Sequence, residues 1–310
     1  MVHTATKRIG LALLFGVSLQ AQAQTPFTVF ACEPEWAALT RVLLPTARLH
    51  VATHAKQDPH HIEARPALIA QLRASDAAIC SGAALESGWL PVLQQRAGNA
   101  KVSNSSAAMF FAADHVSLID AQPGVIGTPW AGDVHEQGNP HFHTDPRRML
   151  EVAQAWSETL QQLQPAQAAA IAQRHAAFQV QWRQRITEWE RRAAPIKGQR
   201  VAAQHSSFAY LWRWLGVQQG VDLEPKPGMA PTPVHLQRLL ETLRAQPAAA
   251  VVISSYQDPR PGRWLSGQFG SSLPVLILPA TVEDETAPDA LGQWMDQVVN
   301  ALVGTLAKSR

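Results

Sequence analysis

Apolar and polar residues follow a pattern of short strands and amphipathic helices in the first half of the chain. Compact apolar runs predict strands over residues 27–31, 49–53 and 76–80. Between them, apolar side chains recur at helical spacing after Pro34 and after Pro66, and proline is favoured in the first turn of a helix. Short buried strands that alternate with helices are typical of parallel βαβ units.

The second half repeats this order of elements. Strands are predicted over residues 200–203, 249–254 and 274–278, and helices over 206–215, from Thr232-Pro233 onward, and along the apolar stripe from Leu291 to Leu302. No residue-level repeat relates the halves. The predicted fold class is α/β, with two lobes whose parallel sheets are flanked by helices.

A long helix is predicted between the halves. Residues 165–194 contain no glycine, and apolar side chains keep helical spacing until Pro195 and Gly198. About 30 residues at a rise of ~1.5 Å make a rod of roughly 45 Å, which is long enough to span both lobes. We therefore expect an N-terminal lobe over residues 24–164, a rigid connecting helix over 165–195 and a C-terminal lobe over 196–310.

The N-terminus has the layout of a secretory signal peptide over residues 1–23. Lys7 and Arg8 precede an apolar run over residues 9–18, and Ala-Gln-Ala predicts cleavage after Ala23. The run is shorter than the ~20 residues that span a bilayer. No cysteine follows it to carry a lipid anchor, so we expect a free periplasmic protein.

Composition and charge narrow the class further. Apolar residues make up 46% and charged residues 16% of the chain, which favours a packed core over disorder. Loss of residues 1–23 removes two basic residues and no acid, so the 26 basic and 24 acidic residues become equal in number. Nucleic acid is therefore not an expected partner. Cys32 and Cys80 could form a disulfide or remain two buried thiols.

Three histidines lie where strands end or helices begin. His60 follows the second strand, His141 precedes the helix that begins at Pro146, and His205 lies between the fourth strand and its helix. Ligands of open α/β sheets bind at the carboxyl ends of strands, so these imidazoles could converge between the lobes. His61 and His143 are expected beside the site or at the surface, and the others are expected to be solvated: His50, His54, His115, His135, His175 and His235.

Ligand chemistry points to zinc. Neutral imidazole suits zinc and related metals, and three histidines with one carboxylate or water form a tetrahedral zinc site. Asp284 and Glu285, which follow the strand over residues 274–278, are the first candidates for the fourth ligand. Glu283, Asp258 and water remain open, since acids are also favoured at a helix start.

The sequence resembles the cluster A-I solute-binding proteins of metal ABC transporters, the zinc and manganese receptors. The likeness rests on the order of five motifs: Asp58-Pro59-His60, residues 77–89 (AAICSGAALESGW), Asn139-Pro140-His141 with Asp145-Pro146, residues 205–210 (HSSFAY), and residues 224–228 (EPKPG). The resemblance implies two lobes joined by one backbone helix, with the metal held between them.

The same resemblance implies ligands and partners. It makes His60, His141 and His205 the ligands, and a histidine at position 205, where manganese receptors tend to carry a carboxylate, favours Zn2+. The zinc receptors often have a long histidine-rich loop before the second ligand, whereas residues 133–138 offer only His135. The implied partner is an ABC transporter permease, with a periplasmic metallochaperone as a further candidate, and we expect a monomer.

The predicted function is high-affinity capture of zinc in the periplasm for an ABC importer, without enzymatic activity. The alternative is an exported zinc-dependent hydrolase that uses the same three histidines and a metal-activated water. No His-Glu-x-x-His helix supports it, because Gln-Gly-Asn-Pro follows His135-Glu136. A third reading is a receptor for an organic solute that stacks on Trp130, Trp212, Trp214 or Trp264.

Overall fold

The computed structural model describes residues 1–2, 26–122, 133 and 135–308, so the predicted signal peptide (beyond its first two residues) and Trp130 lie outside the described residues. The chain forms two four-stranded parallel sheets with the same topology, in the orders β2-β1-β3-β4 and β6-β5-β7-β8. The first contains β1 (Thr28–Ala31), β2 (Arg48–Val51), β3 (Ala77–Cys80) and β4 (Met109–Phe111). The second contains β5 (Arg200–Ala203), β6 (Gln218–Asp222), β7 (Ala250–Ser254) and β8 (Val275–Leu278). This is the predicted fold class.

Alternation along the central strands divides the core into three parts. In β1 and β3, Val29 and Ile79 belong to a large shared core, whereas the intervening Phe30 and Ala78 pack against α2 (Pro66–Arg73) and α3 (Leu90–Ala97). The second sheet divides in the same way, with its other face covered by α7 (Pro233–Ala245) and α8 (Arg260–Gly267). Both faces of each sheet are buried, as parallel sheets require.

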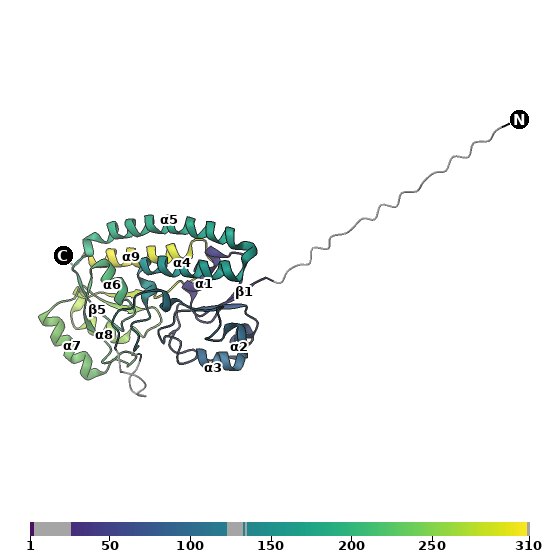
Figure 1. Ribbon diagram of the computed structural model, residues 1–310. Coiled ribbons are helices and arrows are strands. Elements are labelled where there is room, and N and C mark those ends of the chain that lie inside the picture. The colour runs from purple at the N-terminus through teal and green to yellow at the C-terminus, as the bar shows by residue number, and fades with distance from the viewer. Residues whose placement is uncertain (3–25, 123–132, 134, 309–310) are drawn as a thin grey trace.

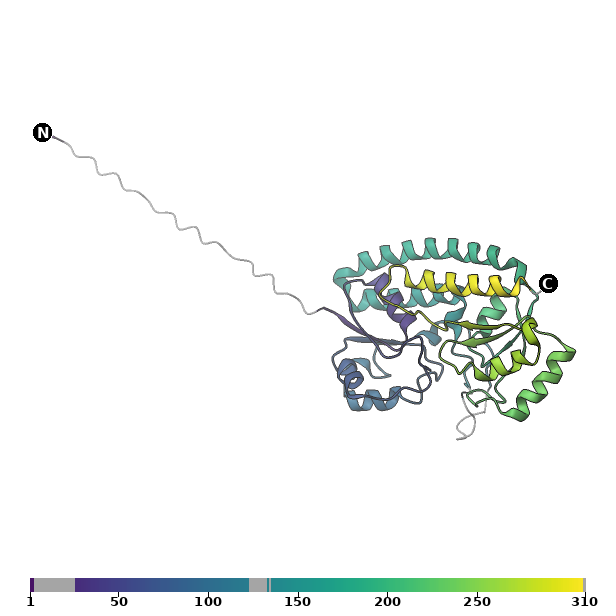
Figure 2. The ribbon, with the colours of Figure 1, turned by 180° about the vertical axis from the view of Figure 1, so that it is seen from behind.

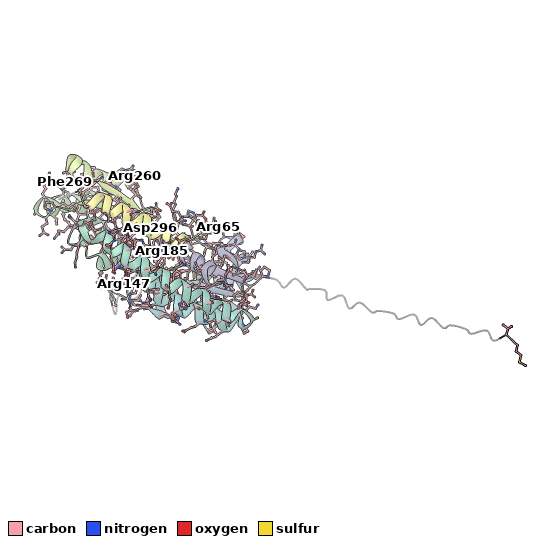
Figure 3. All side chains as sticks on the ribbon, turned by 90° about the horizontal axis from the view of Figure 1, so that it is seen from above. Arg65, Arg147, Arg185, Arg260, Phe269 and Asp296 are labelled. Carbon is pink, nitrogen blue, oxygen red and sulfur yellow. A yellow bond between two sulfur atoms is a disulfide. The ribbon has the colours of Figure 1, made fainter. Side chains whose placement is uncertain are left out.

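One layer of helices covers the inner faces of both sheets. It consists of α1 (Pro34–Leu43), α4 (Pro146–Leu163), α5 (Ala168–Ala193) and α9 (Ala290–Leu306). Figure 1 and Figure 2 show α5 running across the whole width of the two lobes, with α4 and α9 beneath it. Seen from above in Figure 3, Arg185 of α5 lies beside Asp296 of α9, and their charged groups are 3.5 Å apart. The shared layer makes the two lobes one packed unit.

The long central helix is confirmed, with a shorter regular part than predicted. Residues 165–167 form a 3-10 turn, α5 then runs to Ala193, and a second 3-10 turn follows. Its buried tryptophans have partners for their N–H groups: Trp182 donates to the Pro146 carbonyl (2.8 Å) and Trp189 to the Asp296 carboxylate (2.9 Å). Along the chain, one sheet precedes this helix and the other follows it, as the predicted domain boundaries require. The division into domains at those boundaries stays a prediction.

Several elements differ from the sequence prediction. β4, β6, α3 and α8 were not predicted, and α6 (Ala209–Leu215) begins three residues later than expected. The two cysteines form a disulfide between the adjacent ends of β1 and β3, with Cα atoms 4.8 Å apart. None of the described helices is both long and apolar enough to span a bilayer.

Candidate metal centre

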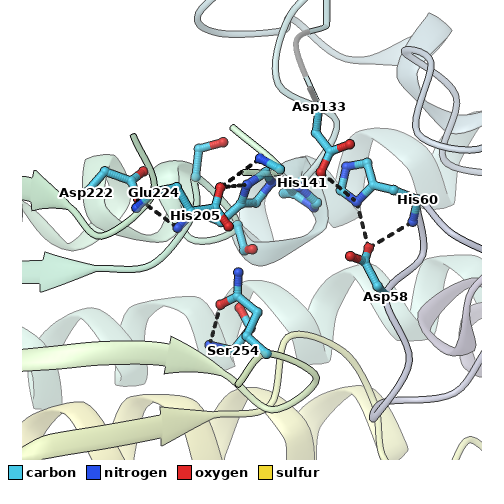
Figure 4. Close-up of polar contacts among 12 residues, drawn as sticks. Asp58, His60, Asp133, His141, His205, Asp222, Glu224 and Ser254 are labelled. Atoms are coloured by element: carbon cyan, nitrogen blue, oxygen red, sulfur yellow. Dashed lines mark hydrogen bonds and ion pairs between the residues drawn. The ribbon is translucent and has the colours of Figure 1, made fainter. Parts of the chain in front are cut away.

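Three histidine side chains meet between the lobes. His60 lies in the loop between β2 and α2, His141 precedes α4, and His205 follows β5. One ring nitrogen from each lies within 4.8 Å of the others, and the residues are only 5%, 2% and 3% exposed. Figure 4 shows the rings pointing toward one another from both lobes. The structure thus brings together the three histidines that the sequence singled out.

The first two histidines are held by the same local structure. In Asp58-Pro59-His60, the Asp58 carboxylate accepts the His60 backbone N–H (3.0 Å), and in Asn139-Pro140-His141 the Asn139 side-chain oxygen accepts the His141 N–H (2.8 Å). These are Asx turns, in which a short polar side chain bonds to the backbone two residues later. Asp58 also contacts His60 Nδ1 at 2.8 Å, which leaves Nε2 free to face the site.

His205 is fixed from the other lobe by two carboxylates. Its backbone has φ of 65°, a left-handed conformation that is uncommon outside glycine. Asp222 accepts the His205 backbone N–H (3.0 Å), and Glu224 contacts Nδ1 (2.9 Å). Glu224 therefore does for His205 what Asp58 does for His60: it orients the ring and leaves Nε2 for a metal.

Two of the separations between ring nitrogens match those of a tetrahedral zinc site. Nε2 of His141 and Nε2 of His205 are 3.3 Å apart, and so are Nε2 of His60 and Nε2 of His135. Zn–N bonds of about 2.0–2.1 Å place neighbouring nitrogens of a tetrahedron about 3.3–3.4 Å apart. The expectation that His135 is solvated is wrong: this histidine is partly buried and contacts His60, and the sequence analysis did not place it beside the other three.

Burial and the neighbouring imidazoles favour the neutral form of His141 and His135. Burial, and then the neighbouring His60 and His205, hold the pKa of His141 well below its usual range. The same two causes, burial and then His60, lower the pKa of His135 to about 4. For His205, burial also lowers the pKa, but the hydrogen bond and charge of Glu224 outweigh it and raise the pKa overall. Neutral imidazole is the form that binds a metal.

The segment that carries His135 is held by the EPKPG motif of residues 224–228. The Asp133 backbone N–H donates to the Pro227 carbonyl (3.0 Å), and the Gly228 N–H donates to Glu224 (2.8 Å). Gly228 has φ of +75°, and a Cβ there would lie 2.5 Å from the Asp133 carboxylate. Only glycine fits this close approach, so the motif supports both His205 and the segment of Asp133 and His135.

A polar cavity of about 230 Å3 leads to the histidines. Its lining includes four acids, which favour entry of a cation: Asp58, Asp133, Glu224 and Asp258. No tryptophan of the described residues lines it. Trp212 and Trp214 are buried in the shared core, and Trp264 lies exposed on α8, so these three of the four stacking partners proposed for an organic solute lie elsewhere.

Asp284 and Glu285, the first candidates for the fourth ligand, are not brought to the histidines. Asp284 is exposed and accepts the backbone N–H of Thr286 (2.9 Å), and the Glu285 carbonyl accepts from Arg41 on α1 (3.2 Å). The chain after β8 thus turns toward the helix layer, away from the histidines. Glu283 is exposed, and Asp258 lines the cavity but pairs with Arg260.

Two neighbouring histidines have other surroundings. His61 is 70% exposed, with Nε2 3.9 Å from the Asp133 carboxylate. His143 is buried: its Nε2 contacts the Ala280 carbonyl (2.9 Å) across the lobe boundary, and its ring stacks on Trp294. His143 therefore joins the lobes beside the site.

Comparisons with known proteins agree with this fold. A family model described as zinc-uptake complex component A, periplasmic, matches residues 29–305. No curated protein sequence matches the chain. Among solved structures, a crystal structure of ZnuA has 18% identity and a TM-score of 0.72, covering 92% of this chain and 99% of its own. A zinc-bound ZnuA deletion mutant has 17% identity and a TM-score of 0.74, with 91% and 98% coverage. The solute-binding protein FpvC of Pseudomonas aeruginosa, in complex with Mn2+, has 18% identity and a TM-score of 0.71, with 91% and 99% coverage.

Proposed function

Because this chain belongs to the family of periplasmic zinc-uptake component A proteins, which are metal-binding receptors of ABC transporters, we propose that its own cargo is Zn2+. The observation that carries the proposal is the pair of 3.3 Å Nε2–Nε2 separations among four imidazoles. An all-nitrogen donor set suits zinc and disfavours Ca2+, Mg2+ and Mn2+, which prefer oxygen.

The proposed ligands are His60, His141, His205 and His135. The Nε2 of His135 contacts that of His60 but does not lie within 4.8 Å of the ring nitrogens of all three other histidines, so His135 would have to move toward His141 and His205 to complete the tetrahedron. This assignment replaces Asp284 and Glu285. Water is the alternative fourth ligand if His135 stays outside.

Four protein ligands also argue against the hydrolase alternative. A hydrolytic zinc site keeps one position open for an activated water. Saturated coordination by four imidazoles suits capture and release instead. We further propose that the mature chain begins at Gln24 in the periplasm, acts as a monomer and delivers its ion to the permease of an ABC importer, whether or not a metallochaperone supplies it.

Elemental analysis of the mature protein, purified without added metal, tests this proposal. We expect one zinc per chain, and after chelation we expect reloading to favour zinc over Mn2+. Replacing His60, His141 or His205 by alanine should weaken zinc binding by orders of magnitude, and the matched His175→Ala variant, on α5, should bind as the wild type does. Equal losses in all four variants, or turnover of generic esters by the zinc form, would overturn the proposal.

The fourth ligand has its own experiment. His135→Ala should weaken zinc binding, whereas Asp284→Asn and Glu285→Gln should leave it unchanged. X-ray absorption of the zinc form should show four nitrogen neighbours in the wild type and three nitrogens with one oxygen in His135→Ala. Three nitrogens and one oxygen in both proteins would assign the fourth position to water.

A further inference from the structure

Two buried carboxyl groups share one backbone N–H donor in the lobe that carries His60. Glu33 and Glu86 are 3% and 2% exposed. The Ser81 backbone N–H faces both of them, at 3.2 Å from Glu33 Oε2 and 2.6 Å from Glu86 Oε1. The Ser81 hydroxyl donates to Glu33 (3.0 Å), and the Gly82 N–H donates to Glu86 (3.0 Å). The two carboxyl groups therefore occupy one small polar site.

The surroundings supply no cation to balance two negative charges. In the described part of the chain, neither carboxyl group pairs with a lysine or arginine, and Glu33 Oε1 is buried without a donor. On the α1 side lies a third buried carboxyl group, Glu35, which contacts Thr281 and has His143 at 3.6 Å. On the other side, the exposed Asp114 lines the same cavity as Glu86. Among the residues that the structure describes, every ionisable group next to the pair is thus another acid.

Two carboxylates this close cannot both ionise in a buried site. Burial raises the pKa of Glu86 to about 7. Burial, followed by the charges of Glu86 and Glu35, raises the pKa of Glu33 well above its usual range. One proton therefore remains on the pair at neutral pH, and the protonated carboxyl group can donate to its neighbour.

The pair holds a strained turn. Gly82, Ala83 and Ala84 are consecutive residues with positive φ, at 79°, 50° and 65°. Left-handed alanines are unfavourable unless the surroundings hold them. The hydrogen bonds from Ser81 and Gly82 to Glu86 close this turn on itself, and the Glu86 carbonyl accepts the N–H groups of Trp89 and Leu90, where α3 begins.

The residues that follow this turn contact the loop of His60. The Trp89 indole N–H donates to the Pro59 carbonyl (2.9 Å). Gly88 lies so close to the same loop that a Cβ there would be 3.1 Å from the His60 carbonyl. Contacts thus run from the carboxyl pair through the turn to the backbone of His60, although neither carboxyl group contacts the histidines.

We propose that Glu33 and Glu86 are positioning residues for metal binding, and that the single proton they share keeps the 81–89 segment in place beneath His60. The proposal rests on the proposed function only in taking His60 as a ligand. Loss of the proton at alkaline pH leaves two anions on the Ser81 amide, loosens the turn and weakens metal binding. The dependence has the opposite sign to that of the histidines, whose deprotonation strengthens binding.

Glu33→Gln is the sharpest test, because it mimics the protonated form. Its amide oxygen can accept the hydrogen bonds from Ser81. Its NH2 group takes the place of Glu33 Oε1, the oxygen without a donor, and can donate to the Glu86 carboxylate. Zinc affinity is measured by competition with a chelator between pH 6.5 and 9.5. We expect wild-type affinity to fall at the alkaline end by about tenfold, the loss typical when support of a metal ligand is removed. Glu33→Gln should match the wild type at pH 6.5 and keep its affinity at pH 9.5.

Three controls separate positioning from a purely structural role. Asp114→Asn makes the same chemical change at the exposed acid of the neighbouring cavity and should follow the wild-type profile. Glu33→Ala should bind weakly at every pH, and rescue by glutamine but not alanine supports the shared proton. Identical profiles for the wild type and Glu33→Gln would overturn the proposal.

A failure of the proposed function has a different signature. If neither protein binds zinc at any pH, hydrogen exchange of the metal-free proteins decides the matter. At pH 9 the peptides over residues 58–62 and 81–90 should exchange faster in the wild type than in Glu33→Gln. Equal exchange would overturn the positioning role independently of the metal.

Discussion

At the scale of single residues, two short sequence repeats have a common physical basis. Asp58-Pro59-His60 and Asn139-Pro140-His141 each use the first side chain to accept the histidine N–H. This relation lies within three consecutive residues, so the sequence could predict it. The contact of Glu224 with His205 joins residues 19 positions apart through the pairing of β5 with β6, and β6 was not predicted.

Glu224→Gln should weaken zinc binding about tenfold, because an amide supports the imidazole less strongly than a carboxylate. Glu224 raises the pKa of His205, so its replacement should also lower that pKa in the metal-free protein. NMR titration of the histidine ring protons measures the second effect and calorimetry the first. Glu63→Gln, at an exposed acid three residues after His60 in the other lobe, should change neither. A raised His205 pKa in Glu224→Gln would contradict this electrostatic account.

Zinc should be lost as the pH falls below about 6, where protons compete for the ligand nitrogens. The pKa of His205 is raised, whereas those of His141 and His135 are lowered, so His205 should take up a proton before these two as the pH decreases. Affinity measured from pH 8 to pH 5 should therefore first fall with a slope of one proton per zinc. A flat profile would mean that imidazoles are not the ligands.

At the scale of elements, the apolar pattern predicted the buried central strands and missed β4 and β6. The fully buried β1, β3 and β7 appear as continuous apolar runs, so their positions were predicted to within a residue or two. β6 reads Gln-Gln-Gly-Val-Asp and has no fully buried position, and β4 has only three residues. α6 begins late because the left-handed backbone of His205 delays the helix. Neither effect is visible in hydrophobic periodicity.

The EPKPG motif gives a prediction at this scale. Gly228→Ala should cost about 1–2 kcal/mol of folding free energy, because its backbone is left-handed, and should also displace Asp133 and His135. Zinc affinity should fall together with thermal stability. Gly198→Ala is the matched control, since Gly198 has φ of +82° but no atom within 4 Å of the added Cβ. It should lose similar stability and keep its zinc affinity; an equal loss of affinity would show that strain alone is responsible.

At the scale of the whole molecule, the shared core joins the lobes. Residues of both sheets pack against α1, α4, α5 and α9 in one continuous cluster. Hinged receptors close through flexible crossovers that this arrangement lacks. The sequence could predict the long helix from its spacing and absence of glycine, but not that α9 would return to cover both lobes, because that depends on contacts between residues far apart.

Zinc should stabilise the molecule strongly while changing its shape little. A ligand at a thousand times its dissociation constant adds about 4 kcal/mol to stability, so the melting temperature should rise clearly on loading. Small-angle scattering should show nearly the same radius of gyration with and without zinc. A decrease on loading of the size that hinged receptors show would contradict a rigid connection through α5.

The continuous core also determines how the ion can leave. If the lobes do not swing apart, zinc must exchange by ligand substitution, in which an incoming donor replaces one imidazole at a time. His60 and His205 line the cavity, so an incoming donor can displace these imidazoles from the metal first. His141 is 2% exposed and does not line the cavity, so it would dissociate from the metal last. The rate of transfer to a chelator should then keep rising with chelator concentration instead of levelling off at a rate of lobe opening. A receptor of this kind holds its cargo for long periods alone and yields it quickly only to a partner that brings ligands of its own.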